Sequence, residues 1–538
     1  MRKSQTMRLS IATLVICASL ALLSPAAFGV RVINEKSVAP IVRLTPPAPV
    51  FDNKERLSEL AQRRAHVSQT IGPKGLLILF SAEPRVYTND VDYPYRQENN
   101  LYYLTTLKQK GSTLILLPGN SQTPEILFLP RRSPAAETWT GHMYSPQEAN
   151  EISGVKEIWE ASEFEPFLKA IRNRQPYRPK PENVLMTPMP ASTPISNDNG
   201  YGVLFDAATK GEADIYMLVP RELESREYKQ EQRFVSDFTK TASGYSVKNA
   251  WPTFTTMRLR KSPMELRLMQ HAIDISTEAH QRAWAAAADA KWEYEVDAVM
   301  AYTFKLRNAD NWGYPDIVGC GPNATTLHYI ESQGPVKSGE LMLMDVGAEY
   351  EHYTADITRT FPVNGKFSPA QAAVYQIVYD AQEAVAKASR PGATLSDVNR
   401  AGTEVVKDGL LKLGLITDRN SSQYRFWFMH GTSHWLGMNV HDVGGGAKFE
   451  PGAVFTNEPG IYVRPDALDY MPIGWRQDEW EKFKTAIRPS FEKYKGIGVR
   501  IEDDMLITPN GVSWMSEALP RKISDIEDFI AKARRQSE

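Results

Sequence analysis

Apolar positions in the first part of the chain gather in short, continuous runs. Runs of this length, bounded by glycine and proline, are typical of buried strands, and they lie at residues 76–80, 113–117 and 126–129. The segment 56–67 has helical spacing instead. Together these elements predict an α/β domain over residues 53–172, a normal size for one domain.

The C-terminal half contains three well-marked helix signals. Ser262-Pro-Met-Glu265 and Ser368-Pro-Ala-Gln371 each combine an N-cap serine, a proline at the first helical position and a residue that completes a capping box. A third helix is expected from about residue 396 to 413. Strand-like runs alternate with these helices, so residues 256–520 predict a second, larger domain of α/β or α+β class.

The segment between these two domains lacks a clear period. Residues 173–200 contain six prolines, which favour a linker or a long surface loop. Residues 201–255 carry no pattern strong enough to place them. We therefore assign residues 173–255 to a linker or connecting region.

The N-terminus differs from the rest of the chain. Residues 1–29 begin with basic residues, continue through the apolar stretch Leu9–Leu23 and end in small residues, with a cleavage point expected after Gly29. This pattern predicts an export signal, because it is too short for a comfortable membrane span. We expect a periplasmic or secreted protein, with an uncleaved N-terminal anchor as the alternative and no other membrane segment.

Composition narrows the classes of function. Hydrophobic residues make up 42% and charged residues 23%, which suits a folded protein with large cores. The net charge of −2 and the absence of a long basic run argue against nucleic-acid binding. The two cysteines are Cys17, inside the signal, and Cys320. Once the signal is removed, neither an intrachain disulfide nor a thiolate metal site can form.

A hairpin-like stretch from Leu341 to Phe361 carries two isolated carboxylates. Leu341 to Met344 is too apolar for a surface strand, so Asp345 follows a buried run where an unpaired charge costs several kcal/mol. A metal ion could offset this cost, and antiparallel strands could bring Asp345 and Asp356 to the same ion. From these residues alone, two acids in ordinary ion pairs are an equally good interpretation.

Three further clusters follow the hairpin. Three of the nine histidines, His430, His434 and His441, fall within twelve residues of a glycine-rich segment. Glu458 closes an apolar run before Pro-Gly, and alternation puts Arg500 and Glu502 on one face of a strand. Each cluster taken alone has an ordinary structural explanation.

Taken in order, these motifs resemble the pita-bread metallopeptidases, most closely aminopeptidase P, also called Xaa-Pro aminopeptidase. The resemblance covers residues 53–172 and 256–520 and rests on Asp-Ile-Thr-Arg-Thr-Phe-Pro, His-Gly-Thr-Ser-His-Trp-Leu-Gly and Gly-Val-Arg-Ile-Glu-Asp-Asp. It implies an N-terminal α/β domain followed by a C-terminal pita-bread catalytic domain. The metal ligands that it implies are Asp345, Asp356, His434, Glu458 and Glu502.

Four carboxylates and one imidazole make an oxygen-rich ligand set whose charge would balance two divalent cations. Such ligands suit manganese, with cobalt or zinc as alternatives. The resemblance implies hydrolysis of the N-terminal Xaa-Pro bond of peptides through a metal-bridging hydroxide. A prolidase-type Xaa-Pro dipeptidase is the nearest rival. An inactive peptide-binding relative and a metal-free, creatinase-like hydrolase rank lower, because all five ligands are retained.

The resemblance also implies roles around the metals. Glu458 is expected to transfer a proton to the leaving nitrogen. His430 and His441 match positions near the scissile bond, where they could stabilise developing charge or position the substrate. A structural role beside the metal ligands is the alternative for both histidines.

Three residues are expected on the substrate side of the site. His328 matches a substrate-side histidine, and Arg500 is expected to restrain the acidic ligands. Tyr102 falls where relatives often place a tryptophan that reaches toward the site. Whether the N-terminal domain contributes to the substrate pocket is therefore left open. Residues 464–495 form an insert between two ligand strands that we expect near the rim of the active site. The family also suggests a homo-oligomer.

Overall fold

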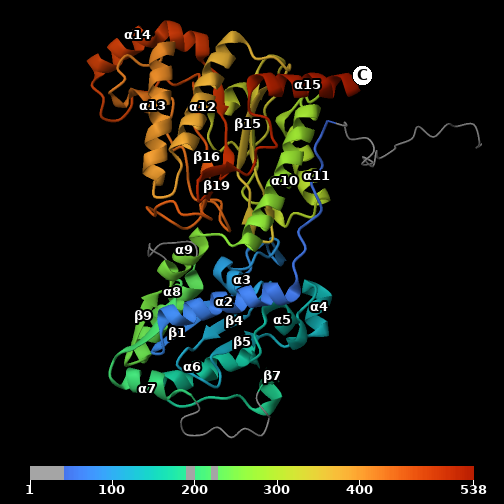
Figure 1. Ribbon diagram of the computed structural model, residues 1–538, viewed down its shortest axis with the longest axis vertical. Coiled ribbons are helices and arrows are strands. Elements are labelled where there is room, and N and C mark those ends of the chain that lie inside the picture. Colours follow the sequence, from blue (N-terminus) through green and yellow to red (C-terminus); the bar gives the residue numbers. More distant parts are fainter. Residues whose placement is uncertain (1–40, 189–199, 220–227, 538) are drawn as a thin grey trace, which may run out of the picture.

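The computed structural model describes residues 41–188, 200–219 and 228–537. The predicted export signal, residues 1–29, lies outside the described residues. Two bodies lie end to end along the long axis, the N-terminal one carrying β1 to β9 and the C-terminal one β10 to β20 (Figure 1). Among the described residues, no helix is both long and apolar enough to cross a membrane.

A seven-stranded mixed sheet forms the centre of the N-terminal body. Its order is β7-β6-β5-β4-β1-β8-β9, and β1, β4 and β5 pair antiparallel at its middle. These are the three apolar runs of the sequence, and almost all of their residues are buried. The strands are β1 Gly75–Phe80, β4 Thr113–Leu116, β5 Glu125–Leu129, β6 Ile158–Glu160, β7 Val184–Met186, β8 Ala213–Met217 and β9 Tyr245–Asn249.

Helices cover this sheet, and a short hairpin extends from it. The predicted helix over 56–67 is part of α2, whose N-cap is Asp52. The hairpin consists of β2 Val86–Thr88 and β3 Val91–Asp92. The helices are α2 Asn53–Ile71, α3 Asn99–Thr105, α4 Pro134–Thr140, α5 Pro146–Ser153, α6 Phe164–Arg172, α7 Gly202–Thr209 and α8 Lys229–Thr241.

The region 173–255, predicted as a linker or connection, contains part of this sheet. Strand β8 pairs parallel with β1, and β9 pairs parallel with β8, so the sheet continues well beyond residue 172. In β8 only every second residue is fully buried. A strand this short, with partly exposed residues between its buried ones, is stabilised mainly by pairing with neighbouring strands. A local sequence pattern does not reveal that pairing.

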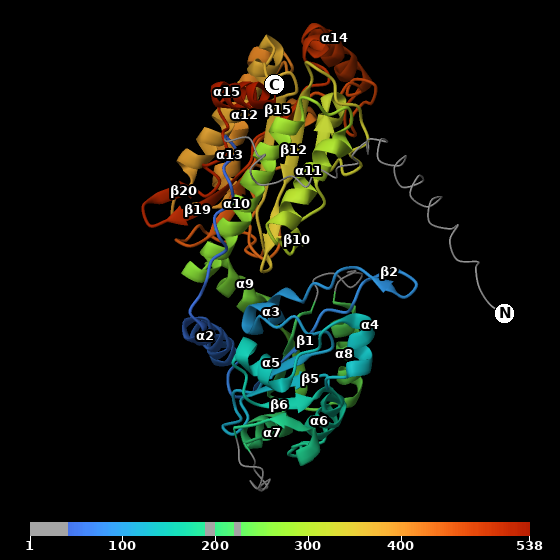
Figure 2. The same ribbon diagram turned by 90° about the vertical axis from the view of Figure 1, so that its right-hand side faces the viewer.

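Two helices lead from one body into the other. Helix α9, Trp251–Leu259, lies at the junction, and α10, Pro263–Ala286, runs up along the C-terminal strands (Figure 2). The predicted capping box is formed, because the Ser262 hydroxyl accepts from the amide of Glu265 and the Glu265 carboxylate accepts from the amide of Ser262. Helix α11, Glu293–Leu306, packs against α10.

Small antiparallel sheets form the middle of the C-terminal body. Strands β12 and β15 pair along their full length and are buried throughout, with Asp345 opposite Thr358. The strands are β10 Asn311–Trp312, β11 Ile317–Cys320, β12 Leu341–Val346, β13 Ala348–Tyr350, β14 Tyr353–Thr354, β15 Ile357–Pro362, β16 Val454–Asn457, β17 Gly460–Tyr462, β18 Gly498–Arg500, β19 Asp503–Thr508 and β20 Gly511–Trp514.

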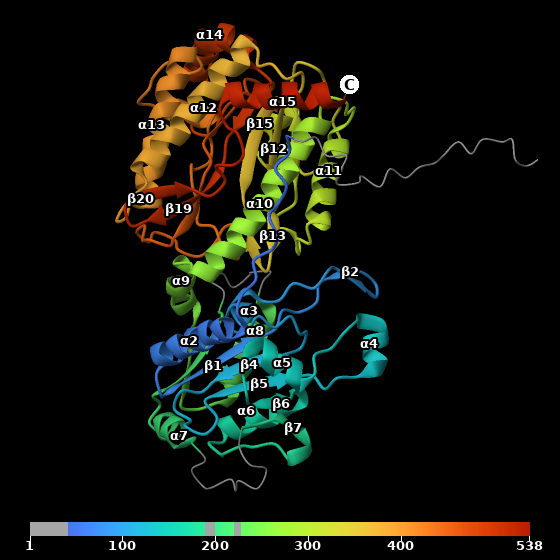
Figure 3. The ribbon, with the colours of Figure 1, turned by 45° about the vertical axis from the view of Figure 1, so that its right-hand side comes forward.

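Helices flank these strands on two sides. Helices α10 and α11 lie on one side, and α12, Pro369–Ala388, and α13, Leu395–Leu413, on the other (Figures 1 and 3). Helix α12 starts at the predicted Ser368 capping box. Helix α15 is Ile523–Ser537. The strands that carry the predicted ligands are therefore held between two helix pairs.

The insert at residues 464–495 folds mainly as helix α14, Gln477–Tyr494. It lies at the end of the C-terminal body away from the N-terminal domain (Figure 1). Its Trp480 and Phe483 pack against the ring of Phe426. The insert thus contacts the stretch that leads to His430, and its role in substrate access stays a prediction.

Candidate metal centre

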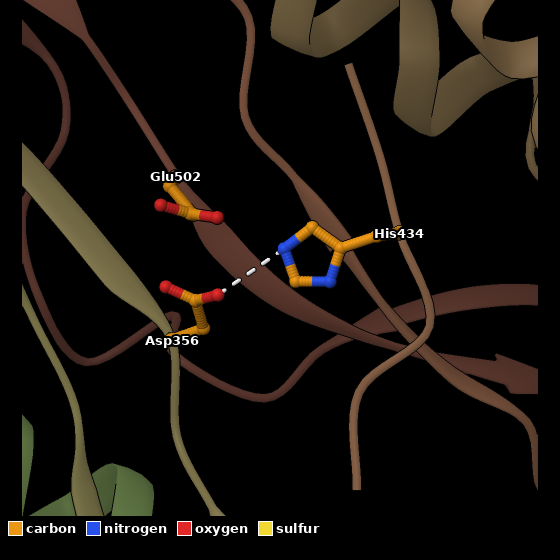
Figure 4. Close-up of side chains that lie close together, drawn as sticks. All are labelled: Asp356, His434 and Glu502. Atoms are coloured by element: carbon orange, nitrogen blue, oxygen red, sulfur yellow. Dashed lines mark ion pairs between the residues drawn. The ribbon is translucent and has the colours of Figure 1, made fainter. Parts of the chain in front are cut away.

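Polar residues from four separate segments converge between the helix pairs. Asp345 lies on β12, Asp356 stands just before β15, and Glu502 connects β18 to β19. Figure 4 shows the side chains of Asp356, His434 and Glu502 pointing toward one another from three separate segments of the chain. One ligand atom of each lies within 4.8 Å of the others, which is close enough to hold an ion.

The other two predicted ligands adjoin this group. The Nε2 atom of His434 lies 3.2 Å from an oxygen of Asp356 and 3.7 Å from an oxygen of Glu458. The hydroxyl oxygen of Tyr314 lies 2.6 Å from an oxygen of Asp345 and 2.7 Å from an oxygen of Asp356, so its single proton can be donated to either carboxylate. The structure therefore brings all five residues together, although their role as ligands remains a proposal.

Burial and mutual repulsion dominate the electrostatics of this cluster. Burial raises the pKa of Glu458 to about 7, with a charge on Asp356 acting in the same direction against the opposing effect of His434. Burial, Asp356 and Asp345 hold the pKa of Glu502 well above its usual range. So many buried carboxylates with few basic neighbours are unfavourable unless they are protonated or neutralised by cations.

The pKa of the His434 imidazole is also raised, which for a base favours the charged, protonated form. Burial lowers its pKa, but the hydrogen bond with Asp356 and the charge of Glu458 outweigh burial and raise the pKa to about 9. A proton on His434 thus partly neutralises the acids in the metal-free chain. Metal ions at this position would replace that proton.

The donor set fits divalent cations. Asp504, a sixth acid, has a buried oxygen without a hydrogen-bond partner among the described residues, while its other oxygen accepts from the amide of Asp356. Burial and Asp356 raise its pKa well above the usual range. Carboxylate oxygens with one imidazole and no thiolate favour hard or intermediate divalent ions. We conclude that these residues suit a two-ion centre.

Arg500 lies inside the acidic cluster and is almost fully buried. Its guanidinium donates to Asp345 at 2.5 Å and to the hydroxyl of Tyr462 at 2.8 Å. It also donates to Thr358, whose hydroxyl donates to Glu502 at 2.6 Å. These contacts match the expected support of the acids. The predicted role of Arg500 in substrate binding stays a prediction.

Three of the remaining predicted residues surround the cluster. The ring of His430 lies 2.8 Å from the hydroxyl of Tyr462 and 3.5 Å from an oxygen of Glu458. The ring of His441 packs edge-on against that of His434, with centroids 4.3 Å apart. His328 is exposed, and its charge contributes to lowering the pKa of His430, after the larger effects of burial and Arg500.

Tyr102 contacts the turn between the metal-site strands rather than the cluster itself. Its ring stacks on His352 with centroids 3.8 Å apart, and its hydroxyl bonds to Glu351. The side chain is almost fully buried. These described contacts put Tyr102 in the interface between the two bodies, and its role as a substrate contact stays a prediction.

The structure adds two residues that the sequence analysis missed. Asp504 follows Glu502 within the same motif, so the third acid of Glu-Asp-Asp was a usable signal. Tyr314 stands apart from every motif, in a short stretch before β11, and only the fold brings its hydroxyl between Asp345 and Asp356.

The fold and the site together define a metal-dependent hydrolase with an attached N-terminal α/β domain. Residues 267–509 match the family model of metallopeptidase family M24, and residues 60–178 match the aminopeptidase P N-terminal domain. The predicted fold class is therefore confirmed. The five converging residues all lie within the matched M24 region.

Similar proteins agree over nearly the whole chain. The Xaa-Pro aminopeptidases of Haemophilus influenzae and Escherichia coli are each 32% identical, over 88% and 89% of this chain and 97% and 98% of their own. The structure of aminopeptidase P from Escherichia coli with the inhibitor Pro-Leu is 29% identical, covers 90% of this chain and 100% of its own, and has a TM-score of 0.71. The chain belongs to the Xaa-Pro aminopeptidase family of M24 metallopeptidases.

Proposed function

We propose that the protein removes the first residue from peptides that carry proline in second position. The convergence of Asp345, Asp356, His434, Glu458 and Glu502 carries this proposal, because the residues lie in one buried cluster in a chain that aligns with Xaa-Pro aminopeptidases almost end to end. The scissile amide before proline lacks an N–H. As in any amide hydrolysis, the leaving nitrogen must also receive a proton, which a side chain of the enzyme can supply.

Two divalent cations would be held by these five residues, and when bound they supply Lewis-acid activation of water and of the scissile carbonyl. Manganese is the ion we propose, with cobalt and zinc as alternatives, because the donors are mainly carboxylate oxygens. Tyr314 and Arg500 fix the orientation of Asp345 from two sides. The acids are therefore oriented by neighbouring donors, as metal ligands usually are.

Glu458 is placed to hold the proton that the leaving nitrogen needs. One of its oxygens faces His434 and the other faces His430. A carboxylate that lies between two imidazoles can accept a proton from water and pass it to a nearby nitrogen. His430, whose pKa burial lowers to about 3, stays neutral and can donate a hydrogen bond to developing negative charge.

His441 and His328 complete the proposed substrate side. Both are exposed, whereas the five converging residues are at least partly buried. Exposed imidazoles beside a buried cluster are positioned to contact a peptide that enters from solvent. We assign them to substrate positioning and charge stabilisation rather than to metal binding.

A peptide assay tests the proposal. Turnover of an Xaa-Pro-Yaa peptide is expected with added manganese, and it should be abolished by a chelator and reduced at least about a hundredfold in Glu458→Gln. The matched control Glu450→Gln changes an exposed glutamate that pairs with Arg260 and should retain activity. Undiminished turnover in chelator would overturn the mechanism. Preference for an Xaa-Pro dipeptide over the tripeptide would favour the dipeptidase alternative.

We also propose export and self-association. The sequence of residues 1–29 supports a signal cleaved after Gly29, which N-terminal sequencing of the protein from periplasm or culture medium would test. Detection of intact residues 1–29 in a membrane fraction would favour an anchor. Light scattering of the purified chain would show whether it forms the proposed homo-oligomer.

A further inference from the structure

His441 depends on the backbone around it for its orientation. It stands on the loop after His434, and its ring rests edge-on against the His434 ring. The loop closes by a hydrogen bond of 2.9 Å from the amide of Asp442 to the carbonyl of Trp435. A shift of residues 439–442 would therefore move the His441 imidazole relative to the metal cluster.

A single guanidinium contacts the residues on both sides of His441. The Nη2 atom of Arg258 donates to the side-chain oxygen of Asn439 at 2.8 Å and to a carboxylate oxygen of Asp442 at 2.6 Å. The side chains of Arg258 and Asp442 are each only 1% exposed. This buried, charge-assisted contact joins the two ends of the tetrapeptide that carries His441.

The same guanidinium ties this loop to the N-terminal domain. Its Nη1 atom donates to the side chain of Asn100 at 2.9 Å, and the side chain of Asn99 donates to Asn439 at 2.9 Å. Both asparagines lie in the first turn of α3. Arg258 therefore links α3 of one body to the active-site loop of the other.

The loop has little room to rearrange around this contact. Lys261 approaches the second oxygen of Asp442 at 3.3 Å and is as buried as the carboxylate. A methyl group built on Gly437 would lie 2.1 Å from that same oxygen. The carboxylate of Asp442 thus sits in a space that is filled from three directions.

We propose that Arg258 is a positioning residue for the peptidase reaction, which holds His441 over the metal cluster by bracing Asn439 and Asp442 against the N-terminal domain. This inference rests on the proposed role of His441 in the reaction. It assigns the N-terminal domain a part in catalysis that does not require any of its side chains to touch the substrate.

Replacing Arg258 by lysine separates charge from geometry. Lysine keeps a positive charge beside Asp442, but its single ammonium lacks the planar fork that reaches Asn439, Asp442 and Asn100 together. In Arg258→Lys we expect kcat/KM for a proline-second peptide to fall about tenfold or more, mainly through kcat, while the bound metal content stays unchanged. Asn439→Ala, which removes a shared acceptor without disturbing the buried charges, should lower kcat/KM in the same way.

Arg64→Lys is the matched control. Arg64 is also a buried, bridging arginine, with contacts to Glu125 and to the carbonyls of Leu104 and Ser153 inside the N-terminal domain. Its replacement should lower the thermal midpoint while kcat/KM stays within about twofold of the parent. Equal losses of kcat/KM in Arg64→Lys and Arg258→Lys would show that general destabilisation, rather than positioning, explains the result.

A double-mutant cycle with His441→Ala decides between positioning and a merely structural role. If Arg258 acts through His441, Arg258→Lys lowers kcat/KM about tenfold in the parent and by less than twofold in the His441→Ala background. The same tenfold loss in both backgrounds would overturn the inference. Full activity of His441→Ala alone would instead remove the proposed role of His441, and with it the basis of this inference, while the assignment of the peptidase activity would stand.

Discussion

At the scale of single residues, His434 governs the charge of the metal cluster. In the metal-free chain its pKa is raised to about 9, because its hydrogen bond with Asp356 and the charge of Glu458 outweigh the lowering effect of burial. The imidazole is therefore protonated at pH 7, and Glu458, with a pKa of about 7, is partly protonated. A cation can bind His434 only after that proton has left.

Metal binding should therefore release protons and strengthen as the pH rises. A folded-state pKa of about 9 for His434 means that affinity should gain at least about tenfold per pH unit between roughly pH 7 and 9, and more where Glu458 and Glu502, whose pKa values are also raised, release protons as well. Calorimetric titration of the metal-free protein in two buffers of different ionisation enthalpy measures the proton release directly. Equal affinity at pH 7 and pH 9, or an enthalpy independent of buffer, would contradict this account.

The same residues show what sequence alone could establish about the site. Asp345, Asp356, His434, Glu458 and Glu502 were predictable because each stands in a motif whose residue types and order match a known family. The role of the Tyr314 hydroxyl was not predictable from sequence. Its hydrogen bond to Asp345 joins residues about thirty positions apart, which only the fold brings together. The contacts of Tyr102 were not predictable for a related reason, since its partners Glu351 and His352 come from the other body.

At the scale of elements, local signals predicted the helices better than the sheet edges. Ser262 and Ser368 start helices with capping boxes, because the capping interactions lie within four residues of one another. Strands β1, β4 and β5 were visible as continuous apolar runs. Strands β8 and β9 were missed, since each has only five residues without a continuous buried run, and they are strands through the pairing of β8 with β1 and of β9 with β8.

Strand β18 illustrates how an element positions the site, and Gly498 is its weak point. A methyl group at Gly498 would lie 2.1 Å from the carbonyl oxygen of Ala324, so the strand or its neighbour must shift. Arg500 lies two residues further on the same strand and holds Asp345. We expect Gly498→Ala to cost about 2 kcal/mol in the free energy of unfolding and to lower kcat.

Urea unfolding and peptide turnover, measured on the same samples, check this expectation. The matched control is Gly446→Ala, where a methyl group would meet no atom within 4 Å. That variant should unfold at the parent's urea concentration. Parent-like stability and turnover of Gly498→Ala would mean that the close approach of β18 to Ala324 is not maintained in solution.

At the scale of the whole molecule, we expect the stability of the two bodies to differ in how much it depends on bound metal. The core of the N-terminal sheet is formed by apolar residues of β1, β4, β5 and their helices. In the C-terminal body the strands β12, β15 and β18 surround buried acids that Arg500 and a protonated His434 only partly neutralise. Burying like charges without a counter-ion is unfavourable, so cations should stabilise the C-terminal body selectively.

Hydrogen exchange with and without chelator tests this division. Removing the metal should speed amide exchange in β12, β15 and β18, because the cost of bringing the carboxylates together then opposes local folding. The strands β1, β4 and β5 should keep their protection, apart from any change at the interface where Arg96 donates to Glu349. A uniform change in both bodies would show that the metal acts on global unfolding. No change in β12, β15 or β18 would mean that the buried acids tolerate one another by protonation alone, and the charge-balance argument for the two-ion centre would then fail.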